Sequence, residues 1–241
     1  MSVEAGLPEG FFELHRGLPR EGPGRPEDVL WALEATGLSG AVRVLDAGCG
    51  PGADLETLAK ALPEAEVEGV DMVAGFAEEA QARVARFGGR AYARHGDMAA
   101  LEGPYDLIWC AGALYFLGVA HGLRLWRDAL APGGWIAFSE PCYPSDDPSG
   151  DARAFWRGEA GVSGLDDLRS RVAAAGYVLR GERMIVGAAW QAYYDPLEAR
   201  ADALEAQCRA ARAVADARRE IALWRAAREE IAYALLLVQP A

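Results

Sequence analysis

Residues 42–52 read Val-Arg-Val-Leu-Asp-Ala-Gly-Cys-Gly-Pro-Gly, an apolar run that ends at Asp46 and continues into three glycines at alternate positions. Valine and leucine in such a run are typical of a strand that is buried on both faces of a parallel sheet. The glycines allow sharp turns and a close approach of the backbone to a ligand. Residues 53–61 favour a helix whose N-terminus faces the same crevice. The stretch therefore predicts a strand, a nucleotide-binding loop and a helix.

Apolar and helical segments alternate from residue 26 to residue 140. A proline followed by two acids at 26–28 is typical of a helix start, and Gly37 is expected to end that helix near Thr36. Ala131-Pro132-Gly133-Gly134 favours a turn. Further helices are expected at 53–61, 75–87 and 118–130, and strands at 42–46, 67–70, 90–94, 105–110 and 135–138. The alternation predicts an α/β fold with a doubly wound, Rossmann-like parallel sheet.

The order of elements changes after residue 144. Helices are expected at 151–159, 164–175 and 197–230, and strands at 177–186 and 232–238, which brings the sheet to seven strands. Because the chain contains no repeat and no low-complexity linker, it is expected to form one domain over residues 1–241. Its parts would be a lid and helix at 1–37, a ligand-binding core at 42–140, a helical insertion on the substrate side at 144–230 and a closing strand at 232–238.

Composition and charge narrow the class of protein. The formal net charge of −12 disfavours a nucleic-acid partner, which generally requires basic patches. No apolar run reaches the length of a membrane span, and the N-terminus does not resemble a secretory signal, so a cytoplasmic protein is expected. The 4 cysteines show no spacing typical of disulfides or zinc sites, and no bound metal is expected.

Polar and small residues follow the predicted strands where a ligand would bind in an open α/β sheet. Asp46 precedes the glycine loop. Asp71 ends the second strand, 19 positions beyond Gly52, where a carboxylate would accept hydrogen bonds from ribose hydroxyls. Asp97-Met98 could offer a carboxylate to an adenine amino group and a thioether to the adenine face. Ala111 lies in a turn that is small enough to pass beside a bound ligand.

These residues together resemble the class I S-adenosylmethionine (SAM)-dependent methyltransferases. The glycine spacing is G-x-G-x-G, against the G-x-G-x-x-G of nicotinamide enzymes. The segments 15–24, 106–109, 139–141 and 190–196 resemble a group of largely uncharacterised bacterial small-molecule methyltransferases. The resemblance implies an antiparallel last strand and SAM as the cofactor. The acceptor is not implied, because the group shares no common substrate.

The resemblance also implies roles for individual residues of the core. The glycine loop would approach the methionine part of SAM, Asp71 would bind ribose, and Asp97-Met98 would bind adenine. Independently of the resemblance, a cluster near the N-terminus, Arg16, Arg20 and Arg25, could hold a carboxylate of SAM or of an acidic substrate, or form a solvated edge of the lid. The expected cofactor-binding residues are Asp46, Gly48, Cys49, Gly50, Gly52, Asp71, Met72, Asp97, Met98, Ala111 and Arg20.

Two residues are candidates for a catalytic base, which methyl transfer needs only if the acceptor is protonated. Glu140 follows the predicted fifth strand, where it could contact substrate; alternatively, it pairs with an arginine or caps the next segment. His15 lies in the expected lid, although a lone histidine is more often structural. Aromatic side chains could form a substrate pocket for an apolar or cationic group, or pack the insertion onto the sheet. They are Tyr115, Trp190, Tyr193 and Tyr194.

Several functions remain open at this level. The chain could methylate a small molecule, methylate protein or RNA, or bind SAM without catalysis. Its charge and the lack of an Asn/Asp-Pro-Pro-Tyr motif after the fourth strand disfavour a macromolecular acceptor. A nicotinamide reductase is a fourth possibility, which the lack of a Tyr-x-x-x-Lys pair disfavours. The chain could be a monomer or a homodimer, because the 197–230 helices would suit a dimer face as well as a lid.

Overall fold

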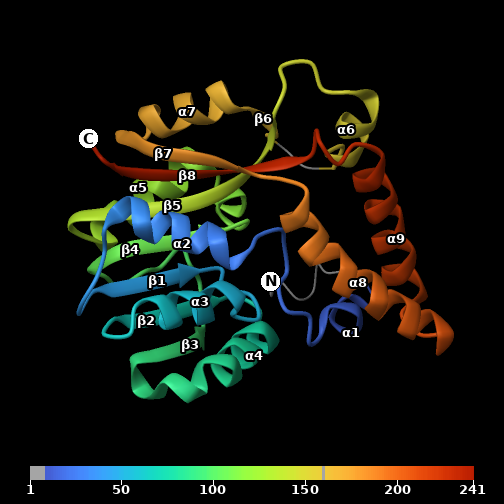
Figure 1. Cartoon of the computed structure of the whole chain (residues 1–241), viewed down its shortest axis with the longest axis horizontal. Helices are drawn as coiled ribbons and strands as arrows, with labels where there is room; N and C mark the ends of the chain where they lie inside the picture. Colours follow the sequence, from blue (N-terminus) through green and yellow to red (C-terminus); the bar gives the residue numbers. More distant parts are fainter. Residues whose placement is uncertain (1–8, 159–160) are drawn as a thin grey trace.

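An eight-stranded sheet forms the centre of the protein, a computed structural model of which describes residues 9–158 and 161–241 (Figure 1). Its strands are β1 Arg43–Ala47, β2 Glu66–Asp71, β3 Ala91–His95, β4 Tyr105–Ala111, β5 Leu130–Tyr143, β6 Ser163–Gly164, β7 Tyr177–Ile185 and β8 Ala232–Pro240. Seven strands follow the order β3-β2-β1-β4-β5-β8-β7, and the short β6 pairs with β5. Only β8 is antiparallel to its neighbours. The predicted seven-stranded Rossmann-like sheet with an antiparallel last strand is confirmed, and β6 is an addition.

Helices cover both faces of the sheet. The α-helices are α1 Phe11–His15, α2 Pro26–Thr36, α3 Ala53–Ala61, α4 Ala74–Val84, α5 Val119–Leu125, α6 Gly150–Phe155, α7 Leu165–Ala174, α8 Ala188–Ala206 and α9 Ala211–Ala226. Short 3₁₀ segments are η2 Ala85–Arg90, η3 Leu114–Phe116 and η4 Trp126–Ala129. Val44 of β1 packs in the core with α2, α3 and α4, and the next residue, Leu45, packs in the core with α5 and α7. This alternation explains why the strand is apolar throughout.

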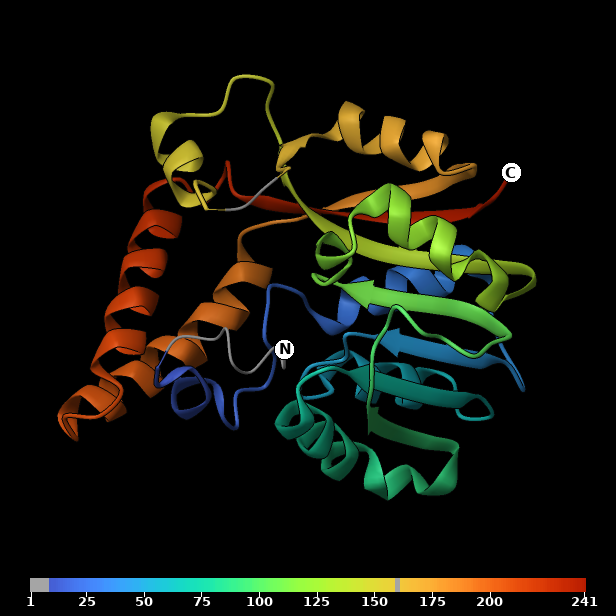
Figure 2. The same cartoon turned by 180° about the vertical axis from the view of Figure 1, so that it is seen from behind.

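A third group of helices lies beyond the carboxyl ends of the parallel strands. Figures 1 and 2 both show α1, α8 and α9 together at this end of the sheet, with α6 beside the start of β8. Among the described residues, no helix is long and apolar enough to cross a membrane. The predicted helix at 151–159 ends at Phe155, and its last residue, like residues 1–8 of the predicted lid, lies outside the described part.

Two predicted boundaries are wrong. The fifth strand was expected at 135–138 after a turn, but β5 runs over Leu130–Tyr143, because β8 pairs with it from Ile136 to Cys142 and the start of β4 pairs with Leu130. The helical stretch expected at 197–230 is instead two helices. The first, α8, begins at Ala188 and continues through Pro196, and a turn at 207–210 separates it from α9.

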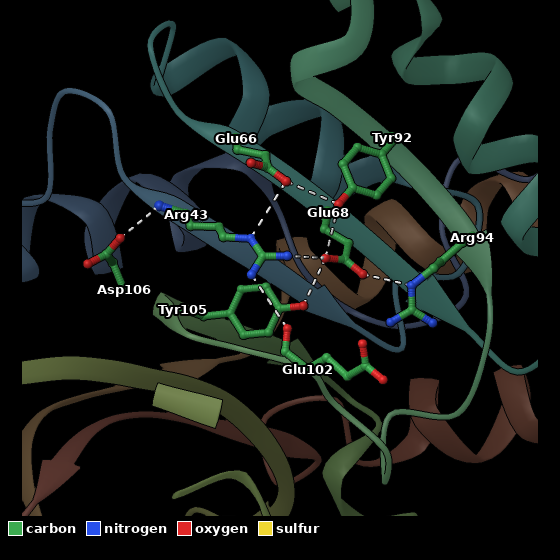
Figure 3. Close-up of polar contacts among 8 residues, drawn as sticks. All are labelled: Arg43, Glu66, Glu68, Tyr92, Arg94, Glu102, Tyr105 and Asp106. Carbon is green, nitrogen blue, oxygen red and sulfur yellow. Dashed lines mark hydrogen bonds and ion pairs between the residues drawn. The ribbon is translucent and has the colours of Figure 1, made fainter. Parts of the chain in front are cut away.

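A charged network connects the amino-terminal half of the sheet (Figure 3). Glu68 of β2 is only 3% exposed, yet its carboxylate accepts hydrogen bonds from four side chains. The Tyr105 hydroxyl donates at 2.8 Å, and Arg94 Nε donates at 2.7 Å. Arg43 and Tyr92 donate at 3.4 and 3.2 Å. Because a buried carboxylate is tolerated only when its oxygens are paired, this network stabilises the junction of β1, β2, β3 and β4.

Replacing Tyr105 by phenylalanine is expected to lower the free energy of unfolding by about 2 kcal/mol. The substitution removes one donor from a buried carboxylate and changes little else, because Tyr105 is fully buried. Urea unfolding followed by circular dichroism measures the change. Tyr92→Phe is the matched control, since that hydroxyl is more exposed and its loss should cost less than about 1 kcal/mol, as expected for a weaker hydrogen bond. Equal losses in both variants would contradict the interpretation.

Candidate functional site

A cavity of about 730 Å³ lies over the carboxyl ends of β1, β2 and β4. The sheet order changes direction between β1 and β4, and ligands of open α/β sheets bind at this point. The cavity is closed on its other side by α1, the loop at 20–23, η3, and single residues of α8 and α9. It brings together most of the residues predicted from the sequence: His15, Arg20, Asp46, Gly48, Cys49, Gly50, Asp71, Met72, Asp97, Met98, Ala111, Tyr115 and Tyr193.

The glycine loop leaves β1 and crosses the end of β2. The Gly48 N–H donates to the Val70 carbonyl at 2.8 Å, and Gly48 has a φ of +75°. A Cβ at Gly48 would lie 2.7 Å from Cβ of Ala113. Gly48 is therefore required both by its left-handed backbone and by the close approach of the loop that follows β4.

Gly52 does not line the cavity, contrary to the prediction. It has a φ of +86° and is the N-cap residue of α3, where a Cβ would lie 2.8 Å from the Cα of Ala80. Its position is explained by the close packing of the start of α3 against α4, rather than by contact with a ligand.

Asp71 anchors the loop from the end of β2. Its two carboxylate oxygens accept hydrogen bonds from the backbone N–H groups of Gly50 and Val73, each at 2.8 Å. Burial raises the pKa of Asp71, and these two donors and His95 partly oppose the rise. A carboxylate has about four acceptor positions, so Asp71 retains capacity toward the cavity.

Asp46 is the most deeply buried acid of the cavity, with 2% of its surface exposed. Its Oδ2 atom has no hydrogen-bond partner among the described residues. Burial raises the pKa of Asp46 well above its usual value, and the nearby carboxyls of Asp54 and Asp71 raise it further. An unpaired buried carboxyl oxygen is costly, so this position favours a ligand that supplies a donor.

Arg20 is held in the cavity wall by an ion pair. Its Nη2 donates to Asp54 Oδ1 at 2.8 Å, and Trp109 Nε1 donates to Asp54 Oδ2 at 3.1 Å. Asp54 lines the cavity but was not predicted as a site residue. The available signal was its position as an acid in the first turn of the helix that follows the glycine loop.

His15 forms a second pair at the cavity wall. Its Nδ1 lies 2.5 Å from Glu21 Oε2, and the ring of Phe11 stacks on the imidazole at a centroid distance of 4.0 Å. Glu21 Oε1 is buried and has no partner within the described part of the chain. Burial raises the pKa of Glu21, and the hydrogen bond with His15 opposes that rise. The sequence gives no periodic signal for Glu21, which was missed.

Asp97, Met98 and Met72 form the part of the cavity beside β2 and β3. The Asp97 Oδ1 atom accepts from the Ala99 N–H at 2.8 Å, and the Met98 carbonyl accepts from Trp126 Nε1 at 2.7 Å. Asp97 is thus held within the loop after β3, and Met98 is held by Trp126 of η4. Met72 is 41% exposed and lies at the edge of the cavity.

Aromatic side chains from α1, α4, η3, α8 and β8 form much of the cavity wall. Tyr115, Tyr193 and Tyr233 line the cavity, and so do Phe11, Phe76 and Phe116. Trp190 and Tyr194, predicted to line the pocket, do not reach it. Trp190 packs edge-on against Tyr233 with centroids 5.3 Å apart, and Tyr194 lies beside Tyr193 at 5.0 Å. Both are almost fully buried in the core behind the wall, because their turn of α8 faces β8 and α9.

Glu140 lies outside this cavity, contrary to its predicted contact with substrate. It lines a separate cavity of about 60 Å³ with Arg171 and Tyr115, the last of which borders both cavities. Glu140 is 4% exposed, and its Oε1 has no partner among the residues that the structure describes. Burial raises the pKa of Glu140 to about 8, which the charge of Arg171 partly opposes.

Comparisons with known proteins agree with this geometry. A family model described as a methyltransferase domain matches residues 44–134. A trans-aconitate 2-methyltransferase of Methylobacterium nodulans is 39% identical over 108 residues, which cover 43% of this chain and 40% of that protein. An uncharacterised Synechococcus protein is 40% identical over 101 residues, covering 39% of this chain and 24% of that protein. The chain thus spans less than half the length of these curated relatives.

Solved structures resemble the chain over nearly its whole length. A SAM-dependent methyltransferase from Geobacter sulfurreducens, crystallised with S-adenosyl-L-homocysteine, has a TM-score of 0.85 at 24% identity, covering 98% of this chain and 99% of that one. A second, from Thiobacillus denitrificans, has a TM-score of 0.85 at 22% identity with the same coverage. These comparisons confirm the resemblance found in the sequence. Residues 44–134 match the methyltransferase domain model, and the chain has the fold of these SAM-dependent methyltransferases.

Proposed function

We propose that this chain is an enzyme that transfers a methyl group from SAM to a small molecule, and that its main cavity holds both. The observation that carries the proposal is the unpaired, buried Oδ2 of Asp46 beside the glycine loop. An oxygen in this position requires a donor, and the ammonium of the methionine part of SAM is such a donor. The match of residues 44–134 to the methyltransferase domain model supports the proposal.

The residues of the cavity fit the three parts of SAM. The remaining acceptor capacity of Asp71 suits two ribose hydroxyls. Asp97 and Met98 suit the adenine ring with a carboxylate and an apolar side chain. The glycine loop and Arg20 suit the methionine carboxylate, which the Arg20 guanidinium would bind while remaining paired with Asp54.

Catalysis by this site rests on alignment more than on covalent chemistry. When bound, SAM supplies an electrophilic methyl group on a sulfonium, and the acceptor must approach it in line. The cavity wall formed by α1, η3 and α8 holds the acceptor against the sheet side and excludes water. His15 would accept the proton that a protonated acceptor loses, since Glu21 holds its Nδ1 and leaves Nε2 as the ring's acceptor.

The net charge and the segments that border the cavity favour a small acceptor over a macromolecule. The segment at 20–23 and helix α1 border the cavity beside the glycine loop, and the net charge of −12 opposes binding of RNA. In this proposal, residues 42–140 are the SAM-binding core, the described part of 1–37 forms a lid, and 144–230 supplies the substrate side. The strand at 232–238 completes the sheet and contributes Tyr233 to the wall.

Isothermal titration calorimetry with SAM, S-adenosylhomocysteine and NADPH tests the proposal. We expect micromolar dissociation constants for SAM and S-adenosylhomocysteine, which correspond to a binding free energy of about −8 kcal/mol. We expect no measurable binding of NADPH. The whole chain is used, because both walls of the cavity are needed. Binding of NADPH without SAM would refute the proposed cofactor. Release of S-adenosylhomocysteine in a screen of acceptors then separates an enzyme from a SAM-binding protein without activity.

A further inference from the structure

We infer that the methyl acceptor is an amine, which binds as a cation against the aromatic and acidic wall of the main cavity. This inference rests on the proposed function, and it adds the chemical class of the acceptor. Three observations support it: the balance of charges around the cavity, the two carboxylates that line it together with tyrosines, and the aromatic rings in its wall.

The charges that line the cavity are mostly negative. Six described residues carry carboxyl groups, and they face one arginine, one histidine and no lysine. The six are Glu21, Asp46, Asp54, Asp71, Asp97 and Glu220. The arginine, Arg20, is already paired with Asp54, and SAM itself adds a net charge of only about +1 from its sulfonium, ammonium and carboxylate. A cleft lined by charges of one sign attracts ligands of the opposite sign.

Two of these carboxylates come from segments outside the sheet: Glu21 lies against Gly50 of the glycine loop, and Glu220 is on α9. Tyr193 of α8, Glu220 of α9, Glu21 of the lid and Tyr115 of η3 all line the cavity. Burial raises the pKa of the Tyr193 hydroxyl, and the charges of Glu220 and Glu21 raise it further. Glu21 contributes a buried Oε1 with no partner among the described residues. Glu220 is exposed at the edge of the cavity and accepts from the Tyr194 hydroxyl at 2.8 Å.

The rings between these carboxylates suit a cation as well. Tyr115, Tyr193 and Tyr233 present aromatic surface to the cavity, and a second layer of rings, Trp190 and Tyr194, packs behind them. A cation over an aromatic face gains about 0.5–2 kcal/mol, most where water is excluded. Rings that are fixed from behind lose little entropy when a ligand binds. The wall therefore combines aromatic faces with negative charge, the two features that recognise alkylammonium groups.

An amine also explains the arrangement of His15 and Glu21. A protonated amine must lose one proton before its nitrogen lone pair can form the bond to the methyl carbon, while the carbon–sulfur bond breaks and its electrons stay on sulfur. The histidine accepts that proton at Nε2, and Glu21 stabilises the resulting imidazolium through Nδ1. The products are the methylated amine, S-adenosylhomocysteine and one proton, so no further reactant is needed.

The same wall disfavours an acceptor with several carboxylates. A tricarboxylate would bring about three negative charges beside Glu21 and Glu220, with only the already paired Arg20 as a cation. Several partial relatives, including that of Methylobacterium nodulans, are named trans-aconitate 2-methyltransferases. The charge of this cavity predicts a different acceptor class.

Titration of the protein saturated with S-adenosylhomocysteine tests the inference with three probes: 2-phenylethylamine, 3-phenylpropanoate and trans-aconitate. The first two share a ring and differ in charge. We expect the amine to bind at least about tenfold more tightly than either carboxylate, a preference that weakens as salt increases. With SAM in place of S-adenosylhomocysteine, only the amine should promote methyl transfer. Tighter binding of a carboxylate, or equal binding of all three probes, overturns the inference.

Charge-neutral variants separate the acceptor wall from the cofactor site. Glu21→Gln and Glu220→Gln should each weaken amine binding about fivefold to tenfold and leave the affinity for S-adenosylhomocysteine within about twofold. Glutamine at position 220 can still accept from Tyr194, so the fold is retained. Asp216→Asn is the matched control: Asp216 lies on α9, the helix of Glu220, is paired with Arg219 at the surface, and its substitution should change neither affinity.

If Glu21→Gln weakens binding of S-adenosylhomocysteine instead, the carboxylate serves the cofactor and the inference is wrong. If the wild-type chain fails to bind S-adenosylhomocysteine at all, the proposed function itself fails.

Discussion

Asp71→Ala is expected to weaken binding of S-adenosylhomocysteine by about 100-fold or more. The substitution removes the carboxylate proposed to accept from both ribose hydroxyls, and hydrogen bonds to a charged group contribute about 1.5–3 kcal/mol each. It also releases the Gly50 and Val73 N–H groups that position the glycine loop. Calorimetry measures the dissociation constant, and circular dichroism verifies that the variant is folded.

Asp71→Asn is the informative partner of this variant. Asparagine retains one acceptor oxygen and the same shape, so the loss of affinity should be intermediate, about 10-fold. Asp106→Asn serves as a control for the loss of one charge. Asp106 accepts from the Arg43 N–H where β1 and β4 begin, at the opposite end of these strands from the glycine loop. An unchanged dissociation constant in Asp71→Ala would refute the ribose assignment.

Glu140→Gln is expected to make the protein more stable in alkaline solution. The pKa of Glu140 is raised by burial from 4.5 to about 8, so the folded chain holds this proton over a range in which the unfolded chain has lost it. Stability of the wild type therefore falls as the pH rises from about 4.5 to 8, and the fall ends above the folded pKa. Glutamine does not titrate, so the variant lacks this fall, and its advantage in free energy of unfolding at pH 8 should reach about 4 kcal/mol.

Chemical denaturation at pH 5, 6, 7 and 8 measures the difference in free energy of unfolding between the variant and the wild type. These values span roughly the interval between the pKa of Glu140 in the unfolded chain and its pKa in the folded chain. The two curves should converge near pH 5 and separate steadily above it. Glu229→Gln, at an exposed position, is the control and should follow the wild type at every pH. A constant difference between Glu140→Gln and the wild type would show that Glu140 does not titrate in this interval.

Local sequence signals predicted the elements that depend on neighbouring residues. The helix Pro26–Thr36 has its predicted bounds, because a proline and acids start it and Gly37, with a φ of +66°, ends it. The helix Ala53–Ala61 also has its predicted bounds. The residues after β1, β2 and β3 reached one cavity, since parallel strands bring their carboxyl ends to one edge of the sheet.

The errors lie where distant segments decide the structure. Glu140 was placed at a strand end, but β8 pairs along β5 as far as Cys142 and extends the strand past it. Glu140 therefore lies within the strand and lines the smaller cavity, which shares Tyr115 with the main one. Trp190 and Tyr194 were placed in the pocket for their aromatic character, but only Tyr193 of this turn of α8 faces it.

The sequence by itself determined the α/β class, the glycine loop and the acids expected to bind the cofactor, because these depend on local propensity and on the fixed direction of parallel strands. Only the tertiary structure decided the acceptor wall, where Glu21, Tyr193 and Glu220 come from three segments far apart in the chain. No spacing in the sequence encodes that juxtaposition, since it arises from the packing of α8 and α9 against the lid. The charge that we propose to select the acceptor is therefore a property of the folded chain.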